Sequence, residues 1–196
     1  MKKMMMMLIM ATVALTASAQ NTLRDDGTFT LQPKVGIGFG SLSGDWISNL
    51  DEDRKMRIGF LVGLEGEYYV NSWLGIAAGV NYAQQGWKFK DSAGTDTYKL
   101  DYLNIPVTAD FYVAKGLALK TGMQFGFLMS GKVNDRDVKD SYEKFNFSIP
   151  IGISYEISNI VLDLRYNLAL SKAYSDNHNK WRSDLLQITV GYKIPL

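Results

Sequence analysis

Residues 117–129 read Leu-Ala-Leu-Lys-Thr-Gly-Met-Gln-Phe-Gly-Phe-Leu-Met, and they carry the clearest structural pattern in the chain. The odd-numbered positions are apolar apart from Thr121, whereas the even-numbered positions are mostly small or polar. Successive side chains of a β-strand point to opposite sides of its sheet, so a period of two indicates a strand with two different faces. The stretch therefore predicts a strand that separates an apolar environment from a polar one.

The same alternation recurs along the chain. In residues 145–157 the odd positions are Phe, Ile or Tyr, and the even positions include Asn, Ser, Gly and Glu. In the strand expected near 99–113 the pattern changes phase around Tyr102, which predicts a β-bulge there. The alternation predicts eight strands in all, near residues 30–42, 57–70, 74–87, 99–113, 117–130, 145–157, 160–172 and 184–196.

The predicted connections alternate strictly between long and short. Three are tight turns, at 71–73, 114–116 and 158–159, and four are long and polar, near 43–56, 88–98, 131–144 and 173–183. All long connections then emerge on one side, as in an up-and-down outer-membrane barrel with short periplasmic turns. A β-propeller blade would place four strands where this chain places two, so a propeller is excluded.

Composition agrees with a single folded domain. The 196 residues are 46% hydrophobic and 21% charged, which is too apolar for a disordered chain. The sequence has no cysteine, which excludes disulfide scaffolds and thiol chemistry. A net charge of +1 gives no basic surplus for nucleic-acid binding, and we expect neither a metal nor a cofactor.

The N-terminus has the pattern of a secretory signal. Lys2 and Lys3 precede an apolar run from Met4 to Ala17, and Ala17-Ser-Ala19 supplies the small residues of a cleavage site. The apolar run is too short to span a bilayer, because a helix needs about 20 residues to cross it. We expect a signal peptide at 1–19, a short periplasmic lead at 20–29 and a barrel at 30–196.

The polar face carries charges of both signs in equal number. A water-facing exterior would not need such a balance, whereas a narrow lumen does, because an unpaired buried charge costs several kcal/mol. The many glycines on the same face would make room for long side chains. We therefore expect apolar side chains to face lipid, and the following ten residues to form a charge network in the lumen: Lys34, Arg57, Glu65, Glu67, Asp110, Lys120, Glu156, Asp163, Arg165 and Lys193.

Aromatic residues on the apolar face gather near the ends of the predicted strands. Two such belts are expected where rings lie at the two boundaries between membrane and water. The last strand ends with Gly191, Ile194 and Leu196 at a spacing that resembles the C-terminal signal read by the barrel-assembly machinery. A final Phe is more usual than the Leu found here.

Three segments resemble a known family. They are Tyr102-Leu-Asn-Ile-Pro-Val107, Phe147-Ser-Ile-Pro-Ile-Gly-Ile-Ser-Tyr155 and Leu162-Asp-Leu-Arg-Tyr-Asn-Leu168. They are similar to the PorT-like outer-membrane β-barrel family of Bacteroidetes, also called the outer membrane protein beta-barrel domain family. The resemblance implies an eight-stranded barrel in a Gram-negative outer membrane. PorT itself belongs to a secretion system, but most members of the family have no assigned activity.

The sequence gives little sign of catalysis. His178 is the only histidine, and it lies in a polar loop without the His-x-Ser arrangement of outer-membrane lipid A deacylases. Cations expected near the outer rim could instead bind the phosphates of lipopolysaccharide through charge-assisted hydrogen bonds. These candidates are Arg54, Lys55, Lys88, Lys90, Lys132, Lys172, Lys180 and Arg182.

We therefore expect an all-β protein, a monomeric antiparallel up-and-down transmembrane barrel of eight strands. The expected function is non-catalytic: surface interaction, envelope integrity or an accessory role in a secretion or transport complex. Three alternatives stay open, namely a narrow porin-like channel, a lipid A-modifying enzyme and a soluble ligand-binding barrel with apolar side chains inside.

Overall fold

A computed structural model describes the backbone of residues 26–42, 54–91, 94–133, 136–137, 144–171, 174–175, 180–181 and 183–196. Eight long strands form the wall: β1 (Phe29–Leu42), β2 (Arg54–Asn71), β3 (Leu74–Asp91), β4 (Gly94–Ala114), β5 (Leu117–Val133), β7 (Phe145–Ile157), β8 (Ile160–Ala169) and β11 (Ser183–Tyr192). Four two-residue strands complete the set: β6 (Arg136–Asp137), β9 (Tyr174–Ser175), β10 (Lys180–Trp181) and β12 (Ile194–Pro195).

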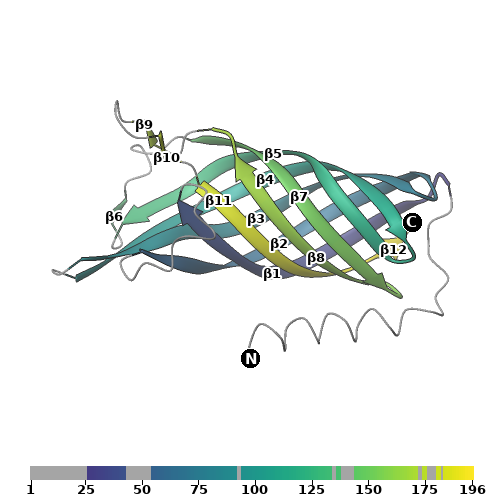
Figure 1. The fold of residues 1–196 in the computed structure, drawn as a ribbon, viewed down its shortest axis with the longest axis horizontal. Helices are drawn as coiled ribbons and strands as arrows, with labels where there is room; N and C mark the ends of the chain where they lie inside the picture. The colour runs from purple at the N-terminus through teal and green to yellow at the C-terminus, as the bar shows by residue number, and fades with distance from the viewer. Residues whose placement is uncertain are drawn as a thin grey trace.

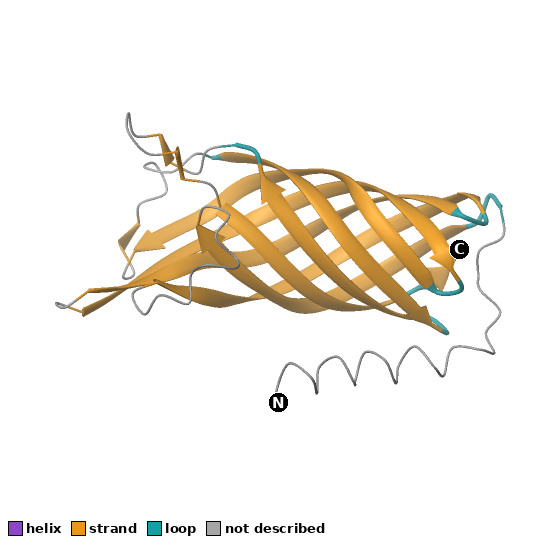
Figure 2. Cartoon of the chain, in the orientation of Figure 1, coloured by secondary structure: helices purple, strands orange, loops and turns teal. Residues whose placement is uncertain are grey.

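The sheet closes on itself. Each long strand pairs antiparallel with its neighbour in the chain, and β11 pairs with both β8 and β1. The short turns lie together at one end, at the right of Figure 1, and the β3–β4 hairpin projects at the other. Figure 2 shows that the described body consists almost wholly of strands. The predicted eight-stranded antiparallel barrel is confirmed.

The barrel is polar inside and apolar outside. Lys120 and Arg165 are 2% and 1% exposed, whereas Met123 and Ile58 are 55% and 63% exposed. On β2 the outward side chains from Ile58 to Val70 are apolar or aromatic apart from a glycine. At about 3.3 Å per residue and a tilt of about 40°, this run is about 30 Å tall, the thickness of a hydrocarbon core. A soluble barrel with an apolar centre is therefore excluded.

Four predicted strand limits were wrong at the end with the long connections. The hairpin expected to open at residue 88 continues to the pair Asp91 and Gly94, so the predicted connection 88–98 is mostly strand. Likewise β2 begins at Arg54, and β5 continues to Val133. Residues 95–97 are Thr-Asp-Thr, and threonine favours β-strands. Their polar character is nevertheless also typical of a loop.

Two predicted strands end early because other groups take their backbone bonds. The strand expected at 160–172 stops at Ala169, whose amide donates to the carboxylate of Asp184 at 3.0 Å. The last strand breaks at Lys193, whose amide donates to the carbonyl of Asn159 at 2.7 Å. The Asn159 side chain donates in return to the carbonyl of Lys193 at 2.9 Å, so the turn 158–159 holds this break.

The bulge predicted near Tyr102 is present, but the extra residue lies on the neighbouring strand. Asp101 pairs with Ser130 and Tyr102 with Leu128, so Met129 is the additional residue. The inward phase of β4 does not change, and Tyr102 is 1% exposed. The bulge is therefore confirmed, whereas the expected change of phase within this strand was wrong.

Candidate functional site: the ionic lumen

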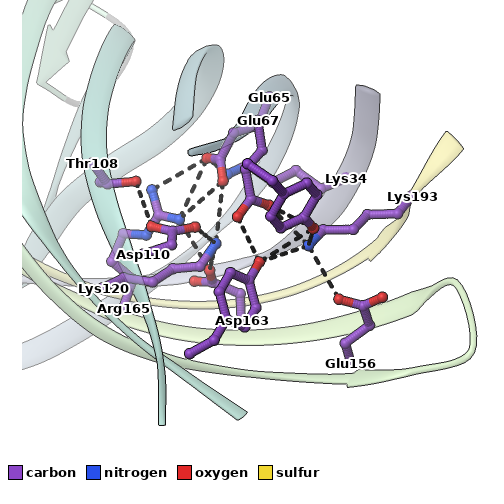
Figure 3. A network of polar contacts seen from close by, with 12 residues as sticks. Lys34, Glu65, Glu67, Thr108, Asp110, Lys120, Glu156, Asp163, Arg165 and Lys193 are labelled. Atoms are coloured by element: carbon purple, nitrogen blue, oxygen red, sulfur yellow. Dashed lines mark hydrogen bonds and ion pairs between the residues drawn. The ribbon is translucent and has the colours of Figure 1, made fainter. Parts of the chain in front are cut away.

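Five strands from around the wall bring six of the predicted charges into one cluster in the lumen. Alternation turns Lys34 on β1, Glu65 on β2 and Asp110 on β4 toward the axis, and all three are buried. Lys120 comes from β5, opposite Asp110 in the strand register, and Asp163 and Arg165 come from β8. We call these six residues the central cluster; Figure 3 shows its side chains pointing toward one another.

Lys120 joins three carboxylates in this cluster. Its Nζ lies 2.9 Å from Asp110 Oδ2, 3.2 Å from Asp163 Oδ2 and 3.3 Å from Glu65 Oε1. The hydroxyl of Thr108 donates to the other oxygen of Asp110 at 2.8 Å. A buried cation with three acidic neighbours compensates much of the desolvation that burial imposes on all of them.

The other two cations meet at Glu65. Lys34 Nζ lies 2.5 Å from Glu65 Oε2, and Arg165 Nη2 lies 3.4 Å from the same oxygen and 2.9 Å from Asp163 Oδ2. Three cations face three carboxylates, so the central cluster is neutral overall. The pairing crosses the lumen, since Glu65 and Arg165 belong to β2 and β8.

A second cluster lies toward the short turns and is built around Lys193. Its Nζ donates to the hydroxyls of Tyr69 and Tyr112 at 2.6 and 2.9 Å, and lies 2.8 Å from Glu67 and 3.1 Å from Glu156. Tyr112 also donates to Glu67 Oε1 at 2.5 Å. We call these five residues the Lys193 cluster; with one cation and two carboxylates it carries a formal charge of −1.

The two tyrosines of the Lys193 cluster were not among the residues predicted for the lumen. Tyr68 and Phe111 are exposed on the outer face, and strand alternation therefore places their neighbours Tyr69 and Tyr112 inside. They are buried, and their rings lie 5.7 Å apart. The alternation alone could therefore have identified both tyrosines as inward residues.

Arg57 belongs to neither cluster. It lies nearer the long connections, is partly exposed, and donates from Nη1 to the backbone carbonyl of Gln85 at 2.5 Å. Asp184, which the sequence analysis did not select, is buried at that end and accepts a hydrogen bond from the hydroxyl of Tyr166 at 2.8 Å.

Between the central cluster and the long connections the lumen changes character twice. First come buried amides that share the inward face, among them Asn81, Asn104 and Gln187, each with an amide atom that has no protein partner. Beyond them, apolar side chains predominate on the inward face, together with the buried amides of Gln85 and Asn167. The inward positions here are Leu61, Ala83 and Leu185 in one group and Leu100, Tyr102 and Leu128 in another, all at most 4% exposed.

Glycine creates the space that these side chains occupy. A Cβ atom at Gly75 would lie 2.3 Å from Glu67 Oε1, and one at Gly63 would lie 2.0 Å from Asn81 Oδ1. Real Cβ contacts are essentially never this short. Glycine at these two positions therefore leaves room for the side chains of Glu67 and Asn81. The glycines and the long polar side chains of the lumen thus pack against one another.

The described residues show neither a metal-binding group nor a membrane-spanning helix. Among the described side chains, no group of three or more His, Cys, Asp or Glu is placed to hold a metal ion. No helix in the described part of the chain is long and apolar enough to cross a membrane. His178 and the predicted signal peptide lie outside the described residues.

The rim cations lie at the limit of the description. Lys172 and Arg182 fall outside it, and the others have a described backbone only: Arg54, Lys55, Lys88, Lys90, Lys132 and Lys180. At the opposite end, Gly191 is buried beside Gln32, whereas Ile194 and Leu196 are 40% and 73% exposed. The amide of Leu196 donates to the carbonyl of Phe29 at 2.9 Å, which joins the C-terminus to the first strand of the barrel.

Comparison with known proteins identifies the fold independently. A family model described as "Outer membrane protein beta-barrel domain" matches residues 18–175, well over half of the chain. No curated protein matches in sequence. Neisserial surface protein A (NspA) is 18% identical over 85% of this chain and 97% of its own, with a TM-score of 0.54.

A second solved structure has the same architecture. Ail, the attachment invasion locus protein of Yersinia pestis, in complex with the heparin analogue sucrose octasulfate, is 17% identical over 86% of this chain and 99% of its own, with a TM-score of 0.51. At such low identity the likeness concerns the fold alone.

Proposed function

Because the chain belongs to the outer membrane protein beta-barrel domain family and is an outer membrane protein, we propose that it is a sealed, non-catalytic barrel that presents its outer connections to the surroundings of the cell. Such a barrel serves surface interaction, envelope integrity or a larger secretion or transport complex. The wall supplies the anchor, and the filled lumen supplies rigidity. Lipid of the outer membrane is its immediate environment.

The observation that carries this proposal is the sequence of layers across the lumen. An ion crossing it would meet the neutral central cluster, in which every charge is already compensated, and then the apolar layer around Leu61 and Tyr102. Breaking a buried ion pair costs about 3–5 kcal/mol, and an apolar constriction resists wetting. Both layers oppose conduction. The central cluster does so because its ion pairs would have to break, and the apolar layer does so because it resists wetting.

A narrow channel is the second candidate, and the amide layer favours it. Asn81, Asn104 and Gln187 have buried polar atoms without a protein partner, as a hydrated path would require. The amides, however, lie between two layers that both exclude ions. The channel therefore demands that the central cluster and the apolar layer both rearrange.

Planar-bilayer recording with folded protein distinguishes the two functions. We expect no steps of conductance from the wild-type barrel. The double variant Leu61→Ser/Leu128→Ser, which makes the apolar layer polar, and Lys120→Met, which breaks the central cluster, serve as graded controls. Steady single-channel currents from wild-type protein that shows the folded, heat-modifiable gel band would refute a sealed barrel.

The absence of catalysis and the membership of a secretion complex need separate tests. If His178 served a lipid A-modifying enzyme, His178→Ala would change the lipid A profile of the cells; we expect no change.

The segments Tyr102–Val107 and Phe147–Tyr155 support a place in the PorT-like group. That placement predicts that deletion of the gene reduces protein secretion, and unaltered secretion would contradict the accessory role.

A further inference from the structure

The amide layer of the lumen is made of buried side chains that lack hydrogen-bond partners. It consists of Asn81, Asn104, Gln124 and Gln187, each at most 3% exposed. Among the described groups, Asn81 has no partner for either Nδ2 or Oδ1. Within the same part of the chain, Nδ2 of Asn104, Oε1 of Gln124 and Nε2 of Gln187 have none either. Nearly all buried polar groups in folded proteins bond to protein or to ordered water, so four such side chains in one layer require an explanation.

The amides lie next to the central cluster, on the side of the long connections. Asn81 of β3 and Asn104 of β4 are register partners. Gln187 of β11 is the register partner of Arg165, a member of the central cluster. On β5, Gln124 is the second inward residue beyond Lys120. Since β4 and β11 are four strands apart whichever way the closed wall is followed, Asn104 and Gln187 lie on opposite sides of the lumen.

The residues between the amides and the ion pairs are too short to fill the lumen. Successive inward positions of a strand are two residues apart, so the position below each amide, toward the short turns, can be read from the sequence. An eight-stranded barrel is just wide enough for its side chains to fill, and glycine, proline and threonine do not reach its axis. These positions, on β3, β4, β5 and β11, are Gly79, Pro106, Gly122 and Thr189. This level of the lumen therefore leaves room for small molecules.

Two further polar atoms beside this level lack partners. The guanidinium of Arg165 is turned toward the central cluster, where Nη2 lies 2.9 Å from Asp163 Oδ2 (Figure 3). Its Nε, however, has no hydrogen-bond partner among the described groups, and neither has Oγ1 of Thr189. Both residues are buried. The Nε–H group can only donate, whereas a hydroxyl can donate and accept.

This level is closed on both sides. Toward the long connections, the next inward residues on β3, β4 and β11 are Ala83, Tyr102 and Leu185, which belong to the apolar layer and are buried. Toward the short turns, the ion pairs of the central cluster follow. Molecules at this level are therefore separated from the solution on either side of the membrane.

We propose that the amide layer encloses bound water. The unpartnered atoms comprise both donors and acceptors, and water is small, neutral and able to satisfy both kinds at once. A metal ion would need carboxylates free of cations, whereas Glu65, Asp110 and Asp163 each contact a cation. An anion would lie beside these same carboxylates.

The inference rests on the proposed function, because only a sealed lumen keeps this water apart from bulk solvent. The bound water also has a consequence for the central cluster. It hydrates the side of Arg165 that carries Nε, which reduces the cost of removing the charges of the cluster from water.

Nuclear magnetic resonance measures contact between water and these side chains. The barrel is labelled with a heavy nitrogen isotope in its Asn and Gln side chains and folded in nanodiscs, and magnetisation is transferred from water to the side-chain amide protons. We expect cross-peaks at Asn81, Asn104 and Gln187 with the sign of water that tumbles with the barrel. Water cross-peaks at fewer than two of these three amides overturn the inference.

Replacing one amide tests whether the same water joins several of them. A buried water makes about three hydrogen bonds, so Asn104→Leu should weaken the water cross-peak of Asn81, its register partner, about twofold or more. An unchanged cross-peak at Asn81 would contradict a shared site.

Urea unfolding in phospholipid vesicles tests the layer by a second route. In a dry layer, an apolar residue of the same shape relieves an unpartnered amide and raises the midpoint of unfolding; beside bound water it removes a partner and lowers the midpoint. We expect Asn104→Leu and Gln187→Met to lower it. Thr121→Leu, on the exposed lipid face, controls for the added apolar side chain and should not lower it. A higher midpoint in both lumen variants overturns the proposal.

The double variant Leu61→Ser/Leu128→Ser separates this inference from the proposed function. It opens the apolar layer, so its water cross-peaks should take the sign of mobile water. If the wild-type protein already shows that sign, the enclosed site and the sealed barrel both fail, and the planar-bilayer recording should then show current. A dry amide layer in a barrel without current overturns the inference alone.

Discussion

Replacing Lys120 with methionine removes the cation that joins three carboxylates of the central cluster. Methionine has nearly the same length and no charge, so packing changes little. Two cations, Lys34 and Arg165, then remain with Glu65, Asp110 and Asp163. Asp110 is left with the hydroxyl of Thr108 as its described hydrogen-bond partner, although it is fully buried.

The expected loss of stability follows from this imbalance. Removing one partner of a buried ion pair costs about 3–5 kcal/mol, because the remaining charge is desolvated without compensation. We therefore expect Lys120→Met to lower the free energy of unfolding by about 4 kcal/mol. In Lys120→Met/Asp110→Asn two cations face two carboxylates again, and Asn can still accept from Thr108. The double variant should recover at least half of the loss.

The measurement is equilibrium urea unfolding in phospholipid vesicles, followed by tryptophan fluorescence and by the fraction of protein in the unboiled, folded gel band. Lys115→Met in an exposed turn is the control and should leave the midpoint unchanged. A single variant within about 1 kcal/mol of wild type would refute the central cluster as a compensated unit, as would a double variant as unstable as the sum of both single ones.

Three further changes test the rest of the lumen and the lipid face. Tyr112→Phe removes a donor to Glu67 and an acceptor for Lys193, and should cost about 1–3 kcal/mol in the same urea titration; no loss would mean that the hydroxyl is not needed. Gly75→Ala drives a Cβ against Glu67 and should cost about 1–3 kcal/mol, whereas an unchanged midpoint would show that the Glu67 side chain moves freely. Met123→Arg puts a charge near the centre of the apolar band and should cost about 2–4 kcal/mol, with Met123→Leu as its control; a tolerated arginine would contradict contact with lipid at this position.

Strand alternation was sufficient to predict the two faces of the wall. The rule needs only the neighbouring residues, so the burial of Lys120 and the exposure of Met123 follow from sequence alone. Three inward tyrosines were nevertheless absent from the predicted lumen residues. Tyr69, Tyr102 and Tyr112 were not recognised as inward residues, because a ring with a hydroxyl suits both a membrane boundary and a polar lumen.

The ion pairs themselves could not be predicted. The sequence shows equal numbers of cations and acids, but pairing depends on the height of each side chain, which the tilt of the strands and the register of closure set. Lys34 and Glu65 meet across adjacent strands, whereas Arg165 and Glu65 are 100 residues apart in the chain. The end of β3 and the start of β4 were missed for a related reason. A polar segment has the composition of a loop, and only its pairing with a second strand shows that it is a strand.

The two strands that close the barrel each insert a lysine into acids held by the rest of the wall. Lys34 comes from β1 and contacts Glu65, and Lys193 comes from the end of the last strand and contacts Glu67 and Glu156. Before closure these acids would face one another with fewer cations, since β2, β4 and β8 supply the carboxylates of the central cluster, and β2 and β7 supply those of the Lys193 cluster. Closing the seam between β1 and β11 thus completes both clusters at once. A slip of one residue at the seam would turn Lys34 or Lys193 toward lipid, so the charges specify the register that the backbone alone leaves open.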